Sequence, residues 1–541
     1  MTQKGQILKS ASAITLVTVI SRICGYLRDQ RVVLLLGTSS AADSFVLAFQ
    51  IPNLIRRLVG EGTLSASFIP VFTQTLRHSP AAAWKLAQRT FWLLAVVLSV
   101  VAILGVIFSR PLIHLFTLFG GHSSSWDLAI FLNRIIFPYI FFIGLAALAM
   151  AVLNSFHVFA LPASTSIYAN LVIIAFSFAF LYKPILHWTP AAFRSPAVAL
   201  ACGVVLGGAV QLAVLIPPLL RRGMNFAPAL SLADPGVRRV SRLLGPSFLG
   251  VSIYQVNFIV DKIFAASPRM PSGSITSLYI GERVMELVLG SYAIAMATAL
   301  LPSMSHQAAA GHFAEMKRTF GFSLRIVSFI TLPAAVGLML FRRPIIQVLF
   351  QHGQFSPSSV LLTARALFWY SLGLPAFAAI KLITPMYSST QDTMTPARIA
   401  ACSLALNIAL NTIFLLFFVR ILSNGGPALA SSLAAYFNFA VLVWVFRRRY
   451  GRLGAHGLIA SHSKMIVSTA VMTAVCLAAI HFSPAAVSAH FLTQVAWLVA
   501  MILVSAAVYF GIARLLRCQE LSELFLLLRR SEEPGSAALR V

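Results

Sequence analysis

Long apolar runs recur along this chain at intervals that fit repeated crossings of a lipid bilayer. A transmembrane helix needs about 20 predominantly apolar residues, and about fourteen runs of that kind follow one another. The predicted segments are 9–36, 43–70, 88–109, 127–154, 161–182, 195–218, 239–265, 274–301, 318–341, 359–383, 396–419, 427–446, 464–482 and 489–514. The pattern therefore predicts an all-α polytopic membrane protein with about 14 transmembrane helices.

The composition agrees with a membrane environment. Hydrophobic residues make up 59% of the 541 residues, and charged residues make up only 10%. A soluble protein of this length could not bury that much apolar surface. Lys4 and Lys9 precede an apolar run as they do in a signal peptide, but Arg22 interrupts the run and no convincing cleavage site follows. We therefore expect this run to be a retained first helix.

Basic residues between the segments predict the orientation. The heaviest clusters follow the sixth, twelfth and last segments, at Arg221, Arg222, Arg238, Arg239 and Arg242, at Arg447, Arg448, Arg449 and Arg452, and at Arg514, Arg517, Arg529 and Arg530. The positive-inside rule makes these loops cytoplasmic, and an even helix number then places both termini in the cytoplasm. Arg342 and Arg343 are an exception to this rule, because they lie in one of the intervening loops, which otherwise carry fewer basic residues. The net charge of +27 is thus explained by topology and anionic lipid, and we expect no nucleic-acid partner.

Short motifs recur at an offset of about 230 residues and indicate a duplicated half. The matches pair Phe108-Ser109-Arg110-Pro111-Leu112-Ile113 with Phe341-Arg342-Arg343-Pro344-Ile345-Ile346, Phe68-Ile69-Pro70 with Leu300-Leu301-Pro302, and Arg89-Thr90-Phe91 with Arg318-Thr319-Phe320. The offset equals six predicted helices, and an even number preserves their direction. We expect two parallel six-helix lobes, 1–222 and 223–450, around a central cavity, then two C-terminal helices in 451–515 and a cytoplasmic tail, 516–541.

Arginines inside the predicted helices are the main candidates for function. Arg22, Arg28, Arg56 and Arg283 lie in otherwise apolar segments. Arginine within a membrane is costly unless it faces water, a cavity or an anion. A guanidinium is planar and permanently charged, and it binds phosphate through two parallel hydrogen bonds. Several such groups predict a binding site for a diphosphate.

A purely structural role is the alternative for these charges. Arg22 and Asp29, Arg57 and Glu61, and Arg283 and Glu286 are spaced so that each pair could be an ion pair within one helix. Arg28 and Arg56 have no carboxylate at helical spacing on the expected face, so the pattern predicts that they lack such a partner. Pro52, within the second segment, is a candidate bending point.

Catalytic and metal-binding patterns are absent from the sequence. The five cysteines and twelve histidines are dispersed, without metal-ligand spacing. No phosphate-binding glycine loop or nucleophile motif occurs. The sequence therefore predicts a protein that is not an enzyme and that has no metal site and no cofactor.

Several motifs resemble those of a known family, the MurJ (MviN) lipid II flippases. They are Ser21-Arg22-Ile23-Cys24-Gly25-Tyr26-Leu27-Arg28-Asp29, Ala42-Asp43-Ser44-Phe45, Ile51-Pro52-Asn53-Leu54-Ile55-Arg56-Arg57, Glu61-Gly62, Gly281-Glu282-Arg283-Val284-Met285-Glu286 and Gln391-Asp392-Thr393. The resemblance covers nearly the whole chain. It implies the fourteen-helix fold of the multidrug/oligosaccharidyl-lipid/polysaccharide (MOP) exporters, with a final helix pair that forms a groove for the lipid tail.

The resemblance also implies a substrate and residue roles. Its substrate is lipid II, an undecaprenyl-diphosphate-linked disaccharide pentapeptide that is moved from the inner to the outer leaflet of the bacterial cytoplasmic membrane for peptidoglycan synthesis. The four arginines correspond to residues thought to hold the diphosphate, and Asp43 and Glu61 to acidic residues thought to act in gating. We expect the motif residues Asp29, Pro52, Asn53, Glu282 and Glu286 to belong to the cavity or its gates. Membrane lipids and the cell-wall synthesis machinery are the other expected partners.

Two rival functions and the energy source stay open at this point. A MOP exporter could instead move drugs or another polyprenyl-diphosphate oligosaccharide. A membrane enzyme acting on polyprenyl diphosphates would need clustered acidic metal ligands, and the chain has only 14 acidic residues. Coupling to the membrane potential, to H⁺ or to Na⁺ is equally open, because no complete ion-ligand set can be placed.

Overall fold

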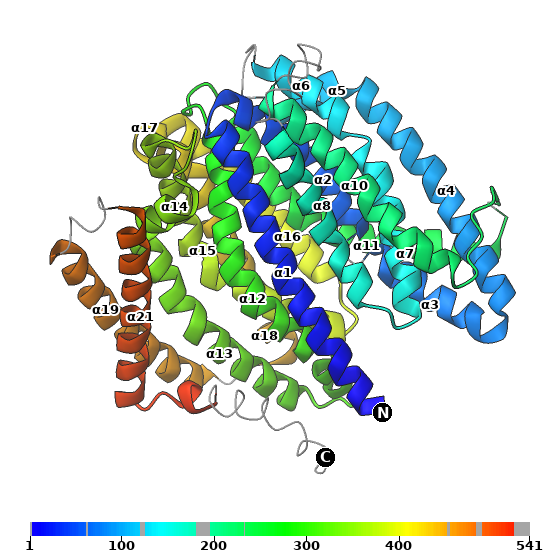
Figure 1. Cartoon of the computed structure of the whole chain (residues 1–541). Coiled ribbons are helices and arrows are strands. Elements are labelled where there is room, and N and C mark those ends of the chain that lie inside the picture. Colours follow the sequence, from blue (N-terminus) through cyan, green and yellow to red (C-terminus); the bar gives the residue numbers. More distant parts are fainter. Residues whose placement is uncertain are drawn as a thin grey trace. The chain divides into compact units, whose positions relative to one another are not determined.

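The computed structural model describes residues 3–60, 63–118, 125–179, 195–231, 233–451, 455–482 and 490–523. Throughout these ranges the regular elements are helices, and no strand occurs in them. The predicted class, an all-α polytopic membrane protein, is confirmed. Figure 1 shows the helices coloured along the chain.

The helices follow one another with short connections. Their bounds are α1 Gln3–Leu36, α2 Ser40–Gly60, α3 Thr63–His78, α4 Pro80–Ile107, α5 Ser109–Phe116, α6 Ser125–Ile136, α7 Tyr139–Ser155, α8 Ala160–Ala179, α10 Pro196–Leu220, α11 Pro235–Ala265, α12 Ser274–Ala309, α13 Phe313–Leu340, α14 Arg342–Phe350, α15 Pro357–Ser389, α16 Met394–Phe417, α17 Val419–Leu422, the 3₁₀ turn η2 Ser423–Gly425, α18 Gly426–Tyr450, α19 Ala455–Phe482 and α21 Phe491–Leu515.

Ten stretches of helix in the described ranges are long and apolar enough to cross a membrane, and they match ten of the predicted segments. The other four predicted segments correspond to α1, to α2 with α3, to α11 and to α12. These helices carry the intramembrane charges, such as Arg28 in α1 and Arg283 in α12.

The chain divides into two compact units. The first comprises Met1–Thr276 and His352–Ser359, and the second comprises Ser277–Gln351 and Val360–Val541. The lobe boundaries at residues 222 and 450 that the sequence predicted stay predictions.

In the first unit, the helices of the N-terminal half pack closely around an apolar core. α1 lies along α8, α10 packs against α7 and α8, and α2 packs against α6 and α7. Buried side chains such as Leu36, Phe45 and Leu132 form this core. A Cβ atom at Gly207 of α10 would lie 3.0 Å from the carbonyl oxygen of Ala169 in α8. Glycine at this position therefore lets two helix backbones approach each other.

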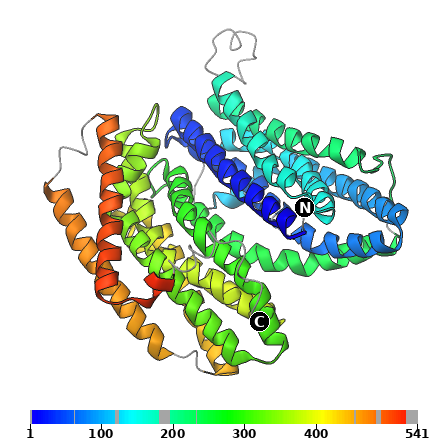
Figure 2. The same ribbon diagram turned by 60° about the horizontal axis from the view of Figure 1, so that its bottom comes forward.

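In the second unit, the last two long helices pack beside α13. α13 packs against α19, and α19 packs against α21. Figures 1 and 2 show α19 and α21 side by side. Their core contains Phe329, Met465 and Tyr509, and the Tyr509 hydroxyl donates a 2.8 Å hydrogen bond to the Phe329 carbonyl oxygen. This bond ties α21 to α13 deep in an apolar environment, where an unpaired hydroxyl would be costly.

The strongest sequence repeat has the same backbone in both copies. α4 ends at Phe108 with φ −87° and ψ 16°, and α13 ends at Phe341 with φ −94° and ψ 14°. Each phenylalanine is followed at once by a short helix, α5 of 8 residues or α14 of 9 residues. The repeated Phe-x-Arg-Pro motif therefore marks a break between a long helix and a short one, with proline in the first turn, where its missing N–H costs nothing.

Candidate anion-binding site

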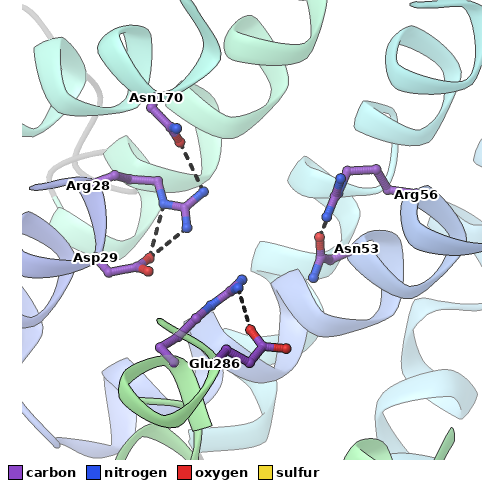
Figure 3. Close-up of polar contacts among 7 residues, drawn as sticks. Arg28, Asp29, Asn53, Arg56, Asn170 and Glu286 are labelled. Carbon is purple, nitrogen blue, oxygen red and sulfur yellow. Dashed lines mark hydrogen bonds and ion pairs between the residues drawn. The ribbon is translucent and has the colours of Figure 1, made fainter. Parts of the chain in front are cut away.

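Arg28 in α1 is held by two partners of the first unit. Its Nε and Nη2 atoms donate to Asp29 Oδ1 at 3.0 and 2.7 Å, and its Nη1 donates to Asn170 Oδ1 in α8 at 3.1 Å (Figure 3). The expectation that Arg28 lacks a local carboxylate was therefore wrong. The spacing rule for helices covers residues three and four apart, whereas a long arginine side chain can fold back onto the adjacent residue.

Arg56 in α2 has a neutral partner. Its Nε donates to Asn53 Oδ1 at 2.8 Å, one turn earlier in the same helix, and Asn53 is buried (Figure 3). Pro52 precedes Asn53 inside the helix. Proline removes one backbone hydrogen bond and loosens the helix there. Asn53 is neutral, and its side chain orients the Arg56 guanidinium.

Arg283 in α12 forms the ion pair that its spacing allowed. Its Nη1 lies 3.0 Å from Glu286 Oε2, three residues later, and the two side chains are 27% and 28% exposed (Figure 3). The guanidinium carbon also lies 5.2 Å from the ring centroid of Tyr279. The neighbouring Glu282 is buried. Arg283 is thus oriented from two sides within its own helix.

The remaining candidates differ in how they are placed. Arg22 lies on an exposed face of α1, six residues before Arg28. Glu61 lies outside the described residues. Within the first unit the structure thus brings Arg28 together with Asp29, and Arg56 together with Asn53; in the second unit it brings Arg283 together with Glu286.

Arg31 is a further arginine inside a predicted membrane segment, and it was not among the candidates named from the sequence. Its Nε donates to Ser177 Oγ in α8 at 3.1 Å, and its guanidinium carbon lies 3.9 Å from the ring centroid of Phe178. Arg28 and Arg31 therefore both fasten α1 to α8. Arg31 lies in the same apolar run as Arg22 and Arg28, so applying the intramembrane-charge criterion to every residue of the run would have found it.

Asp43 lies at the start of α2 and binds the start of α12. Its Oδ2 accepts a 2.8 Å hydrogen bond from the Gly273 N–H, and its Oδ1 accepts bonds from the Thr276 N–H at 2.8 Å and from the Thr276 hydroxyl at 2.7 Å. All three residues belong to the first unit. The first N–H groups of a helix lack partners and favour negative charge. Asp43 therefore caps a helix that begins 231 residues later in the chain.

Two neighbouring loops support this cap. Gly273 has φ +85°, and a Cβ there would lie 2.1 Å from the Thr38 carbonyl oxygen. The hydroxyls of Thr38 and Ser359 are hydrogen-bonded at 2.7 Å, and the Gln354 N–H donates to the Leu34 carbonyl at 2.9 Å. Loops around residues 38, 273 and 355 thus meet at one place in the first unit. These loop contacts hold the partners of Asp43 in position, and the sequence alone did not predict them.

The chemistry that these groups can perform is recognition of an anion. Guanidinium groups held by carboxylates or amides are pre-oriented and suit the planar, two-point binding of a phosphate. Among the described residues, no group of three or more His, Cys, Asp or Glu side chains could hold a metal ion.

A groove in the second unit lies between α13 and α19. It has a volume of about 430 Å³ and is lined by Leu332, Val336, Ile466, Thr469, Ala470 and Thr473. Its lining is mainly apolar and the two threonines bond within α19: Thr469 donates to Met465 O and Thr473 to Thr469 O. A surface of this kind suits a hydrocarbon chain, since the hydroxyls are already satisfied.

Comparisons with known proteins identify close relatives. The family model described as "Lipid II flippase MurJ" matches residues 32–498. A protein of Vibrio cholerae named "Probable lipid II flippase MurJ" is 36% identical over 453 residues, which is 82% of this chain and 83% of the relative.

Solved structures share the fold. A lipid II flippase MurJ in an inward closed conformation matches with a TM-score of 0.75 at 24% identity, over 93% of this chain and 98% of that one. An inward-facing multidrug resistance MATE transporter of the MOP superfamily matches with a TM-score of 0.64 at 14% identity, over 82% of this chain and 99% of that one. At these identities the likeness concerns the fold alone.

Proposed function

Because the chain belongs to the lipid II flippase MurJ family, we propose that it moves lipid II from the inner to the outer leaflet of the bacterial cytoplasmic membrane. The observation that carries this proposal is the family match over residues 32–498. A drug or another polyprenyl-linked oligosaccharide is not favoured as substrate, since the MATE likeness extends to the fold only.

The arginines are proposed to hold the diphosphate. Each of Arg28, Arg56 and Arg283 is oriented by a side chain of its own helix. Asp29 and Glu286 lower the cost of holding the empty site in the membrane, and a diphosphate would then compete with these carboxylates for the guanidinium groups. The cycle is proposed to be one of alternating access, in which the arginines are reached first from the cytoplasmic side and then from the outer side. Transport by such a cycle requires no catalytic residue.

Asp43 is proposed to act in gating. Its three hydrogen bonds fasten the start of α12 to α2. Bonds to a charged acceptor are strong but can be exchanged for bonds to water when the site opens. Breaking them would free the start of α12. We propose the same role for Glu61.

The remaining assignments concern topology and the lipid tail. We propose that both termini and the tail after residue 516 are cytoplasmic, following the basic clusters. The groove between α13 and α19 is proposed to receive the polyprenyl tail, because its apolar lining matches a hydrocarbon chain. Enzymes that make and use lipid II are the proposed partners.

The driving force is proposed to be the membrane potential. Moving one charge across 100 mV is worth about 2.3 kcal/mol, and an inside-negative potential favours outward movement of an anion. H⁺ and Na⁺ gradients are the alternatives. Vesicles in which each gradient is imposed separately would identify the one that accelerates transport.

Leaflet accessibility of labelled lipid II tests the proposed function. Vesicles containing the purified chain are loaded with fluorescent lipid II, and a membrane-impermeant reagent quenches the label in one leaflet. We expect the protected pool to become accessible with the wild-type chain and to remain protected in empty vesicles. Exposure that is equally fast without the protein, or that occurs for a neutral polyprenyl lipid and not for lipid II, would contradict the proposal.

A further inference from the structure

A buried carboxylate lies beyond α21, away from the arginines. Glu520 belongs to a helical turn of residues 519–523, and its side chain is 1% exposed. Neither of its oxygens accepts a hydrogen bond from a residue that the structure describes. Among the described residues, Arg325 in α13 lies beside it, with Nε 3.7 Å from Oε1, which is too long for a hydrogen bond. The Glu520 carboxylate is therefore shielded from solvent, and no described residue donates a hydrogen bond to it.

A second acid lies on the same face of this turn. Glu523 follows Glu520 by three residues, and its Oε2 is also buried and accepts no hydrogen bond from the described residues. Burial raises the pKa of Glu523; the Arg325 charge opposes this rise, and the Glu520 charge adds to it. Among the described residues, these two carboxylates thus share the Arg325 guanidinium.

The turn that carries these acids is packed into the core of the second unit. Cys518 and Leu521 are 4% and 8% exposed and belong to the cluster that contains Phe329 and Tyr509. Lys464 in α19 donates to the Arg517 carbonyl oxygen at 3.3 Å. The segment from residue 517 to 523 therefore docks against α13, α19 and α21, which places both carboxylates against apolar side chains.

We propose that Glu520 and Glu523 form a proton-binding site, in which one shared proton allows residues 517–523 to dock. With the proton bound, the remaining negative charge is matched by Arg325. Without it, two buried carboxylates face one guanidinium, and like charges in a poorly solvated place repel each other. Docking should therefore weaken as the pH rises.

The part of the chain that the structure describes places five other titratable or charged groups around these acids. Arg325 comes from α13, and His462 and Lys464 come from α19. Tyr509 and Cys518 belong to α21 and the turn after it. His462 bonds to the Leu458 carbonyl oxygen and to the Ser328 hydroxyl. Arg514 and Arg517 are exposed. Glu520 and Glu523 are thus the carboxyl groups of this cluster among the described residues. The site is independent of lipid II.

Alkylation of Cys518 reports the docking directly. The full-length protein is labelled with a maleimide from the ordinary glutamate pKa of about 4.3 up to about pH 8, and the Cys518 peptide is quantified by mass spectrometry. Dividing each rate by that of the denatured protein at the same pH removes the thiolate contribution. The buried Cys476 serves in the same sample as a control for unfolding.

The expected result is a normalised rate that rises with pH in the wild type, by up to about tenfold per pH unit for one proton released. Glu520→Gln and Glu523→Gln should each stay slow and flat, since the single remaining carboxylate is matched by Arg325. Arg325→Ala should make the rise steeper and extend it to higher pH, because the docked carboxylates lose the cation that lowers their pKa. Glu315→Gln, an exposed acid on α13, is the matched control and should follow the wild type.

Three outcomes would overturn the proton site. A flat wild-type profile would show that no proton is released over this range. Glutamine variants with the wild-type pH dependence would assign the titration elsewhere. Fast labelling at every pH in both glutamine variants, with Cys476 still protected, would mean that the charged carboxylates themselves hold the segment. If the glutamine variants unfold, Arg325→Ala decides, since a rise no steeper than that of the wild type would overturn the proton site.

Discussion

Asp43→Asn should loosen the start of α12 while leaving the rest of the fold intact. The carboxylate accepts three hydrogen bonds, from two N–H groups and one hydroxyl. An asparagine side chain keeps one oxygen but places an NH₂ group opposite one of these donors, so at least one bond is lost. A hydrogen bond to a charged group contributes about 1.5–3 kcal/mol. Local opening should therefore become about 10- to 150-fold more frequent, at 1.4 kcal/mol per tenfold.

Hydrogen exchange measures this opening at the bonded amides themselves. The Gly273 and Thr276 amides donate to Asp43, so mass spectrometry of a peptide spanning them should show faster exchange by that factor. Thr276→Val removes only the hydroxyl bond and should reach the lower end of the range. Asp127→Asn changes an exposed acid in the first turn of α6 and is the matched control. If exchange in Asp43→Asn matched that in Asp127→Asn, the capping role of Asp43 would be refuted.

Three further predictions concern the arginines, a surface ion pair and the groove. Arg28→Lys keeps the charge but cannot reach Asp29 and Asn170 together, so lipid II transport should fall about tenfold or more for one charge-assisted bond lost; a wild-type rate would contradict this. Burial alone would raise the pKa of Asp392, but hydrogen bonds from the start of α16 and from Arg449 outweigh it and lower the pKa. The ion pair between Asp392 and Arg449 therefore stabilises the fold above the ordinary aspartate pKa of about 4, and this stabilisation is lost as the pH falls through the lowered pKa of Asp392. The unfolding temperature of Asp392→Asn should thus be below that of the wild type at pH 7 and should converge with it in acid. Ala470→Trp should fill the groove between α13 and α19 and slow transport of long-tailed more than short-tailed lipid II; equal slowing would argue against a tail in this groove.

The sequence could predict what depends on local pattern. The long apolar runs predicted the helices, and the spacing of Arg283 and Glu286 allowed the ion pair that the structure contains. A spacing of three in a helix fixes two side chains on one face, whatever surrounds them. The second predicted segment, 43–70, is covered by two helices, α2 and α3, with residues 61 and 62 outside the described ranges.

Contacts between distant elements could not be predicted in this way. Asn170 and Ser177 bind Arg28 and Arg31 because α8 packs along α1, more than 140 residues away in the chain. The partners of Asp43 are an N–H pair and a hydroxyl at the start of α12, which no pattern around Asp43 specifies. Such partners follow from tertiary packing.

The arginines of the candidate site lie in α1, α2 and α12, inside segments that the sequence predicted to cross the membrane. An arginine without a partner would make each of these helices costly to place in a membrane. Their partners reduce this cost in two ways, because Asp29 and Glu286 supply opposite charge while Asn53 supplies only a hydrogen-bond acceptor. The Asn53 contact uses the planar fork of Arg56, and a lysine at this position cannot keep that contact and also bind a phosphate at two points. Arg56→Lys should therefore bind the diphosphate more weakly than the wild type while its thermal unfolding is unchanged, and wild-type binding by this variant would contradict the proposed role of Arg56.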